Sequence, residues 1–469
     1  NFMLYPVVGI VAEYNPFHKG HLIHIRRARE LCGAQAAVAV LSSDFVQRGE
    51  PALADKWTRA EAALAYGADL VLELPVIFSA HNAGVFANGA VDILAASRSV
   101  SHLSFGAETP HCLTDSIIDM ILEEPKPFKL SLKKHLDEGF SFVEARSRAA
   151  DELIPGSGSV LAGSNNTLAL AYMARVKKKN YALTPLPVKR AGAEYNSDEL
   201  EEISSATAIR RALREGRTDE AFKAVPEKSA LLLKSALGDG RLCIDHGNWW
   251  KLLRAALLRS SPEELRRFAE ISEGVEYRLR EAAFTARSFE EWTDACTSKR
   301  YPAGRIRRAA VHIALGLGHW FNRAAQRLGT PYMRPLAMNG TGRALLHEMQ
   351  KKCRTAHRHD VRAGGAHFPL RGGVREIRAA RLRIVGRTRT ERALRRGTQT
   401  PSDNRVTALD VRPSKKRGGR EAIPRLCHFT KIRYLRRTRA AAKKATAASV
   451  TAPPPKASQP PPPVLSAVP

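Results

Sequence analysis

Short buried runs alternate with helical patterns over the first 110 residues, and this alternation constrains the fold more than any other feature. Four apolar runs have strand length: VVGIVA (7–12), AAVAVL (36–41), ADLVLELP (68–75) and SHLSFGAE (101–108). Helical patterns fill the intervals between them, at about 20–32, 56–66 and 83–96. Strands separated by helices build parallel sheets, so we predict an α/β protein with a Rossmann-like, doubly wound parallel sheet.

The rest of the chain divides by pattern into a helical part and a tail. A helix is predicted to begin near Ser164–Thr167, and TPLPVK (184–189) is predicted to be the last strand. The pattern is helical from about 201 to 352. Beyond Lys352 apolar periodicity fades and Arg and Pro dominate. We therefore predict an α/β domain over 1–200, a mostly α-helical domain over 201–352 and a disordered tail over 353–469.

The net charge of +29 is concentrated in the tail. Residues 351–469 hold 30 lysines and arginines against 6 acidic residues, whereas the first 350 residues hold 45 against 40. A segment this basic binds RNA through salt-dependent contacts with phosphates. Two interpretations stay open: a basic RNA-binding extension, or translation of a GC-rich gene in a shifted reading frame.

The composition argues against a membrane-spanning or secreted protein. No uninterrupted apolar run has membrane-spanning length, and the N-terminus lacks the basic start and apolar core of a signal peptide. Six widely spaced cysteines form no CxxC pair. We therefore expect reduced thiols, no structural zinc and a cytoplasmic location.

Two histidines, His18 and His21, lie where the first predicted strand gives way to a helix. Residues three apart share a helix face, so both rings should point the same way from the first turn. That turn carries unpaired N–H groups and the positive end of the helix dipole, which attract a phosphate, and Gly20 would let it approach the backbone. The pair suits stabilisation of a pentavalent phosphorus while pyrophosphate leaves. The alternative is two ordinary surface histidines at a helix start.

Other polar residues follow later strands. Gln47–Arg48 comes after the second strand, and Gly106–Glu108 lies at the end of the fourth. Because ligands bind beyond the carboxyl ends of parallel strands, we expect these residues to gather with His18 at one edge of the sheet.

Six sequence blocks, two of which contain superfamily motifs, carry a resemblance to known proteins. HKGH (18–21) and SSATAIR (204–210) resemble the motifs of the HxGH nucleotidylyltransferase superfamily. More narrowly, six blocks are together similar to bacterial tRNA(Met) cytidine acetate ligases: GIVAEYNPFHKGHL, FVQRGEPALADKW, GADLVLELP, SFGAE, SNNTLALAYM and SSATAIRRAL. The resemblance runs from about Val7 to about Lys352.

This resemblance implies an ATP-dependent ligase. Such an enzyme would convert acetate to acetyl-adenylate and then acetylate N4 of the wobble cytidine of elongator tRNA(Met). Mg²⁺ would accompany the triphosphate. The 1–200 domain would bind ATP, and the 201–352 domain would contact the tRNA.

The resemblance also implies roles for particular residues, with His18 and His21 catalytic and placed on the phosphates. The implied ATP-binding residues are Val11, Ala12, Glu13, Tyr14, Asn15, Pro16, Phe17, His18, Lys19, Gly20, His21, Leu22, Ile23, His24, Gly106, Asn165, Arg190, Ser205, Thr207 and Arg210. Ala206 stands where the family usually has a hydroxyl. Plainer alternatives are a helix cap for Asn165 or Ser205 and a solvated charge for Arg190.

Two further residues and two further functions remain open. Lys56 and Arg48 are candidate contacts to acetate or RNA, or else solvated charges, while Trp57 is expected in the core. One alternative function is a small-molecule adenylyltransferase, which only the HxGH and Ser/Thr-Arg elements favour. The other is a non-catalytic RNA-binding protein, which only the tail favours.

Overall fold

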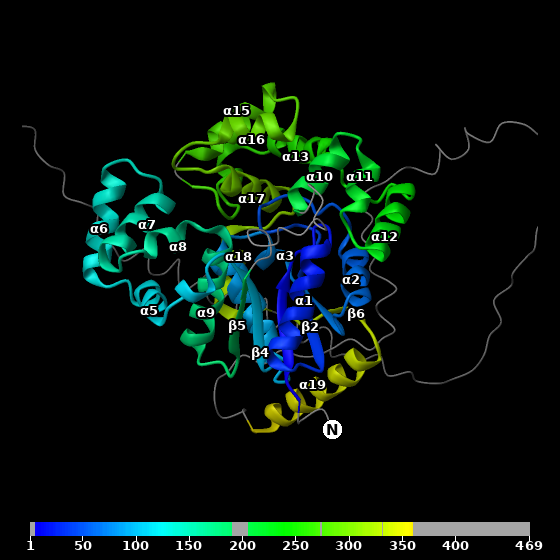
Figure 1. The fold of residues 1–469 in the computed structure, drawn as a ribbon. Coiled ribbons are helices and arrows are strands. Elements are labelled where there is room, and N and C mark those ends of the chain that lie inside the picture. Colours follow the sequence, from blue (N-terminus) through cyan, green and yellow to red (C-terminus); the bar gives the residue numbers. More distant parts are fainter. Residues whose placement is uncertain (1–4, 190–204, 273, 331, 360–469) are drawn as a thin grey trace, which may run out of the picture. The chain divides into compact units, whose positions relative to one another are not determined.

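The computed structural model describes residues 5–189, 205–272, 274–330 and 332–359. It contains a six-stranded sheet in the order β5-β4-β1-β2-β3-β6 (Figure 1). The strands are β1 (Val7–Ala12), β2 (Ala36–Ser42), β3 (Leu70–Leu74), β4 (His102–Ala107), β5 (Thr184–Lys189) and β6 (Pro335–Met338). Neighbouring strands pair in parallel except β3 and β6, which are antiparallel. The doubly wound sheet is thereby confirmed for β1 to β5.

Strand β6 lies within the mostly α-helical stretch 201–352 and was not predicted from the sequence. The register pairs Leu70 with Met338, and the N–H of Glu73 donates to the carbonyl of Arg334 at 2.9 Å. The strand has only four residues and no alternating pattern, so its pairing with β3 defines it. An antiparallel edge strand on a parallel sheet is a common arrangement.

Helices cover both faces of the sheet (Figure 1). On one face α1 (Lys19–Cys32) packs on β1 and α2 (Lys56–Ala65) packs on β2, β3 and β6, and Val8 and Ile10 join Ile25 in one apolar cluster. The other face carries α4 (Ala83–Ala96), α9 (Ser164–Lys179) and α19 (Gly340–His359). Burial on both sides explains the continuous apolar strands.

Local signals in the sequence fix the ends of the sheet-covering helices. The side chain of Asp55 accepts the N–H of Thr58 at 2.8 Å and caps α2, and Asn82 caps α4 in the same way. Gly33 ends α1 with φ at 59°, a conformation that favours glycine. The predicted bounds of these helices are confirmed to within one residue.

The remaining helices fall into two stretches of the chain. Between β4 and β5 lie a 3₁₀ turn η2 (Pro110–Cys112), α5 (Asp115–Glu123), α6 (Lys126–Asp137), α7 (Phe142–Leu153) and α8 (Ser157–Ala162). The second stretch comprises α10 (Ala206–Arg214), α11 (Thr218–Lys223), α12 (Glu227–Gly238), α13 (Gly247–Arg259), α14 (Pro262–Leu265), α15 (Val275–Thr285), α16 (Phe289–Cys296), α17 (Ala303–Ala314) and α18 (His319–Leu328), with α3 (Val76–Ser79) between β3 and α4.

The loop between β2 and α2 packs into the second helical stretch. Phe45 joins the apolar cluster of α13 to α17, with its ring 5.2 Å from that of Trp249. Gly49 has φ at 81°, and a Cβ there would lie 2.3 Å from the main-chain nitrogen of Arg308 on α17. Only glycine fits so close to another backbone, so this contact fixes the loop against the helices.

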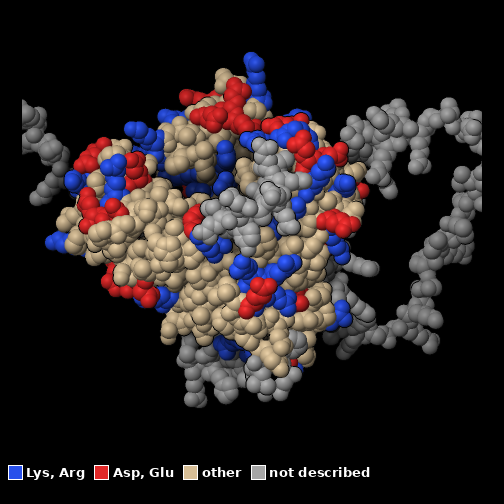
Figure 2. All heavy atoms as spheres, in the orientation of Figure 1, with Lys and Arg blue, Asp and Glu red and all other residues tan. Residues whose placement is uncertain are grey.

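Charge and membrane predictions can be checked on the described residues. Figure 2 shows acidic and basic side chains interspersed on the face in view, in keeping with the near-balanced charge of the first 350 residues. No helix in the described ranges combines the length and apolarity needed to cross a membrane. Cys32, Cys112, Cys243 and Cys296 are free thiols. Helix α19 runs past Lys352 to His359, and the rest of the predicted tail lies outside the described residues.

Candidate active site

The sheet has its switch point between β1 and β4. From β1 the chain continues to β2 on one side, whereas β4 lies on the other side of β1. In open α/β sheets a crevice forms beyond the carboxyl ends of two such strands, and ligands bind there. The loop after β1, Glu13–His18, and the end of β4 at Ala107 meet at this position.

His18 and His21 lie in contact at the start of α1. Their ring centroids are 3.8 Å apart. Nδ1 of His18 accepts the N–H of Gly20 at 3.0 Å, and Nδ1 of His21 accepts the N–H of His18 at 3.2 Å. Because each Nδ1 is an acceptor, each neutral ring carries its proton on Nε2. In that tautomer the remaining ring donors of the pair are the two Nε2–H groups.

This reciprocal capping was not foreseen from the sequence. We expected the first-turn N–H groups to be open to a phosphate, but the N–H of Gly20 is bonded to His18. The backbone thus orients the rings. Gly20 is needed for this packing, since a Cβ would lie 2.9 Å from Cε1 of His18.

Two aromatic residues of the same loop pack against the histidine pair. Tyr14 and Phe17 are 2% and 1% exposed, and the ring of Tyr14 meets that of His21 edge-on at 4.9 Å. Phe17 stacks on Tyr66 at 5.5 Å. Tyr14 and Phe17 belong to the core, so their role is to determine the conformation of the loop.

The other residues predicted for the ATP loop fall into three groups. Val11 and Ala12 are part of β1, and Lys19, Leu22 and Ile23 lie half-buried on α1. Buried Pro16 lies in the loop, and the Asn15 side chain there accepts the N–H of Leu53 at 2.7 Å. His24 contacts the hydroxyl of Ser104 on β4 at 3.1 Å, which joins α1 to the strand across the switch point.

Glu13 brings a carboxylate to the end of β1. Its Oε1 accepts the N–H of Gln47 at 2.6 Å. Burial raises the pKa of Glu13, although that hydrogen bond and the charges of Arg59, Arg210 and Arg48 act in the opposite direction. Gln47 and Arg48 therefore do gather near the first strand's end, as predicted.

The second motif reaches the histidine loop through Arg210. From α10 its Nη1 donates to the carbonyl of Asn15 at 2.7 Å, and Nη2 lies 3.5 Å from Oε1 of Glu50. Among the described residues Nε of Arg210 is buried and has no hydrogen-bond partner, an arrangement that an anionic ligand would satisfy. Ser205 caps α10 by accepting the N–H of Ala208 at 3.1 Å, and Thr207 is exposed.

The end of β4 carries a carboxylate that occupies the start of α9. Oε1 of Glu108 accepts the N–H of Asn165 at 3.0 Å and its side-chain amide at 2.6 Å, while Oε2 accepts the N–H of Asn166 at 2.7 Å. Burial opposes ionisation, but these hydrogen bonds hold the pKa of Glu108 below its ordinary value. Gly106 lies on β4 opposite Val188. Asn165 is thus near the rim, with its donors directed to Glu108.

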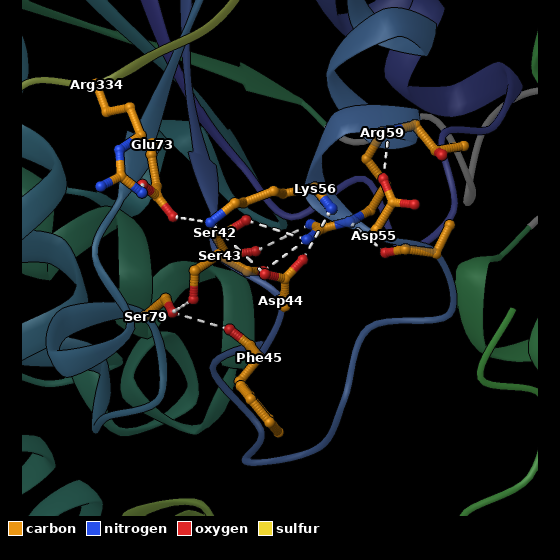
Figure 3. Close-up of polar contacts among 12 residues, drawn as sticks. Ser42, Ser43, Asp44, Phe45, Asp55, Lys56, Arg59, Glu73, Ser79 and Arg334 are labelled. Carbon is orange, nitrogen blue, oxygen red and sulfur yellow. Dashed lines mark hydrogen bonds and ion pairs between the residues drawn. The ribbon is translucent and has the colours of Figure 1, made fainter. Parts of the chain in front are cut away.

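A second polar cluster lies at the ends of β2 and β3 (Figure 3). Arg59 is 2% exposed and donates to the carbonyls of Glu13, Ser42 and Ser43 at 2.6, 3.1 and 2.5 Å. A buried guanidinium thereby ties the ends of β1 and β2 together. The sequence offered no sign of this role, because an arginine on a helix usually faces solvent.

Lys56 is held by acidic partners in the same cluster. Its Nζ lies 2.5 Å from Oε1 of Glu73 and 3.6 Å from Oδ2 of Asp44, and Arg334 lies 3.0 Å from the other oxygen of Glu73 (Figure 3). Two carboxylates therefore neutralise the charge of Lys56, which disfavours an additional acetate anion at this ammonium group. Trp57 packs at the edge of the core, as expected.

Arg190 and a bound metal ion are the remaining predicted components of the site. Arg190 lies outside the described residues. No cluster of three or more His, Cys, Asp or Glu side chains in the described ranges could hold a metal ion. Mg²⁺ that binds substrate phosphates usually keeps several waters and needs few protein ligands.

Comparison with known proteins defines the class to which this fold and site belong. A family model described as HIGH Nucleotidyl Transferase matches residues 5–366. The tRNA(Met) cytidine acetate ligase of Acetivibrio thermocellus is 34% identical over 356 residues, which are 74% of this chain and 86% of that protein. The ligase of the same name from Syntrophomonas wolfei is 36% identical over 352 residues, or 74% and 85%.

A solved structure gives the same answer. Thermotoga maritima TmcAL bound with alpha-thio ATP superposes with a TM-score of 0.69 at 31% identity, covering 78% of this chain and 89% of that one. The chain belongs to the tRNA(Met) cytidine acetate ligase family, within the HIGH nucleotidyl transferases. The resemblance found in the sequence motifs is confirmed.

Proposed function

We propose that this protein activates acetate with ATP and transfers the acetyl group to N4 of the wobble cytidine of elongator tRNA(Met). Family membership supports the ligase class, and the Thermotoga maritima relative was solved with an ATP analogue. The observation that carries the proposal is the histidine pair, whose two rings are 3.8 Å apart and fixed by the backbone at the switch point of the sheet.

The site fits the phosphates of ATP. Two Nε2–H donors would bind phosphate oxygens, and Arg210 would add positive charge from α10, with its buried Nε as a further donor. The side chain of Arg48 is exposed, and its charge acts to lower the pKa of Glu13. Another cation therefore lies near the loop. Mg²⁺ bound with the nucleotide would supply further charge neutralisation on the departing pyrophosphate.

In the first step an acetate oxygen attacks the α-phosphorus and the bond to the β-phosphate oxygen breaks. Acetyl-adenylate and pyrophosphate form. Acetate is already an anion, so no base is needed to activate it, and the protein contributes position and positive charge. His18 and His21 would stabilise the extra negative charge on the phosphoryl oxygens of the transition state.

In the second step N4 of the cytidine attacks the acetyl carbon. AMP leaves and the nitrogen loses a proton, which yields the acetylated base. A base inside a helix could not reach the adenylate, whereas unpaired anticodon-loop bases can be unstacked and presented singly. The mostly α-helical domain predicted over 201–352 would supply the RNA-contacting surface.

Acetate-dependent exchange of pyrophosphate into ATP tests the first step. Exchange that needs acetate supports the ligase. Exchange that needs a nucleotide-like acceptor instead would identify a small-molecule adenylyltransferase, and RNA binding without exchange would identify a non-catalytic protein. Acetylation of an elongator tRNA(Met) transcript, with a control transcript carrying uridine at the wobble position, tests the second step.

A further inference from the structure

Helix α18 exposes an aromatic and cationic stripe. Trp320 is 67% exposed, although tryptophan is among the most buried residues on average. Arg323 and Arg327, three and seven positions further on, are also exposed. This spacing places all three side chains on one face of the helix. We call Trp320, Arg323 and Arg327 the α18 stripe.

The charged side chains of α18 are all basic. Its sequence HWFNRAAQRL contains two arginines and a histidine but no acidic residue. The main-chain N–H of His319 at its start is bonded to the carbonyl of Arg267 at 2.7 Å, which brings a further arginine close to the helix. A stacking ring flanked by arginines is complementary to single-stranded nucleic acid, because bases stack on the ring and phosphates bind the cations.

The opposite face of α18 is tied to the candidate active site. The amides of Asn322 and Gln326 each lie 3.0 Å from Nε2 of His81. The carbonyl of His81 accepts from Nε2 of Gln47 at 3.2 Å, and the N–H of Gln47 donates to Glu13 at 2.6 Å. A short chain of hydrogen bonds thus leads from the end of β1 to α18.

From this placement we propose that the α18 stripe binds the unpaired nucleotides that flank the target cytidine. The inference rests on the proposed function and deepens it by naming a surface for the RNA. When the target base leaves its stack, its neighbours lose a stacking partner, and Trp320 offers a replacement on a helix that is hydrogen-bonded to the candidate active site. Arg323 and Arg327 neutralise the phosphates on either side.

The test compares Trp320→Ala, Trp320→Tyr and the double variant Arg323→Gln/Arg327→Gln with the parent chain. We expect Trp320→Ala to raise the KM for tRNA and the Kd for an anticodon stem-loop about 5- to 150-fold, as the loss of one stacked base implies, with Trp320→Tyr close to the parent. The double variant should reduce the slope of log binding constant against log salt by about 0.7 per lost contact.

Acetate-dependent exchange without RNA separates this inference from the proposed function. Exchange should be unchanged in the α18 variants, and its absence in the parent chain would refute the proposed function instead. Phe142→Ala on α7, where the side chain is 59% exposed, is the matched control. Unchanged RNA affinity and salt slope in the α18 variants, an equal loss in Phe142→Ala, or a change in oligomeric state in place of RNA affinity would overturn the inference.

Discussion

Gly20 lies against the imidazole of His18 so closely that a Cβ at this position would be 2.9 Å from Cε1 and 3.1 Å from Nδ1 of the ring. The ring is itself held by the N–H of Gly20 at 3.0 Å. The glycine of the HxGH motif therefore determines where the first histidine can lie, and this relationship leads to the first prediction.

Gly20→Ala should displace the His18 ring and reduce acetate-dependent ATP–pyrophosphate exchange by about 100-fold, the effect expected for a misplacement of about 1 Å in an active site. Alanine is a better helix former than glycine, so the free energy of unfolding should change little. Gly84→Ala on α4 is the control, since a Cβ there meets its nearest atom at an ordinary 3.5 Å. Normal exchange in Gly20→Ala would contradict the role assigned to this contact.

Arg210→Lys should raise the KM for ATP roughly tenfold or more, the size of a lost hydrogen bond to a charged group. Lysine lacks the planar fork that lets Arg210 reach Asn15 and Glu50 together. Arg214→Lys, one turn further along α10 and exposed, is the control. The comparison is made by initial rates of exchange over a range of ATP concentrations, and equal KM values for the two variants would exclude Arg210 from nucleotide binding.

Glu108→Gln should lower the free energy of unfolding at pH 7 by about 1 kcal/mol, because the carboxylate caps α9. The pKa of Glu108 is lowered in the folded state, so its contribution is present above the unfolded pKa of about 4.3 and is lost as the pH falls through the folded pKa. Urea unfolding at pH 7, 5 and 3.5 measures this. Exposed Glu123→Gln is the control, and a difference from the parent that stays constant from pH 7 to pH 3.5 would argue against the cap.

His81 should make the fold sensitive to mild acid. Burial lowers the pKa of His81 to about 4, below the unfolded value of about 6.5. Its contribution to stability is therefore complete above pH 6.5 and is lost as the pH falls towards 4. Between pH 6.5 and 5 the parent chain should lose about 2 kcal/mol through this group. His81→Asn should flatten that slope in urea titrations, and an equal slope in both proteins would refute the assignment.

The sequence predicted the elements that depend on local pattern and missed those that depend on distant partners. The first strands and α1, α2 and α4 lie where apolar periodicity placed them. Strand β6 has too short a run to be recognised and exists through pairing with β3. The buried contacts of Arg59 could not be predicted either, because its carbonyl partners lie at the ends of two strands that are distant in the sequence.

The candidate site shows the same division. The spacing of the two histidines predicted that His18 and His21 lie together, and the resemblance to the superfamily implied that Arg210 joins them; the rings are in contact, and Arg210 reaches the loop at Asn15. The sequence could not show that Nδ1 of each imidazole is used by the backbone, nor that Glu108 occupies the start of α9. Those details follow from side-chain directions and loop geometry, which no one-dimensional pattern contains.

The most direct measurement of the central claim is acetate-dependent ATP–pyrophosphate exchange by His21→Ala beside the parent chain, with tRNA affinity measured on the same samples. His21→Ala removes one Nε2–H donor and the acceptor that holds the N–H of His18. The account predicts that exchange disappears while tRNA affinity stays near the parent value. Exchange at the parent rate in His21→Ala would contradict it.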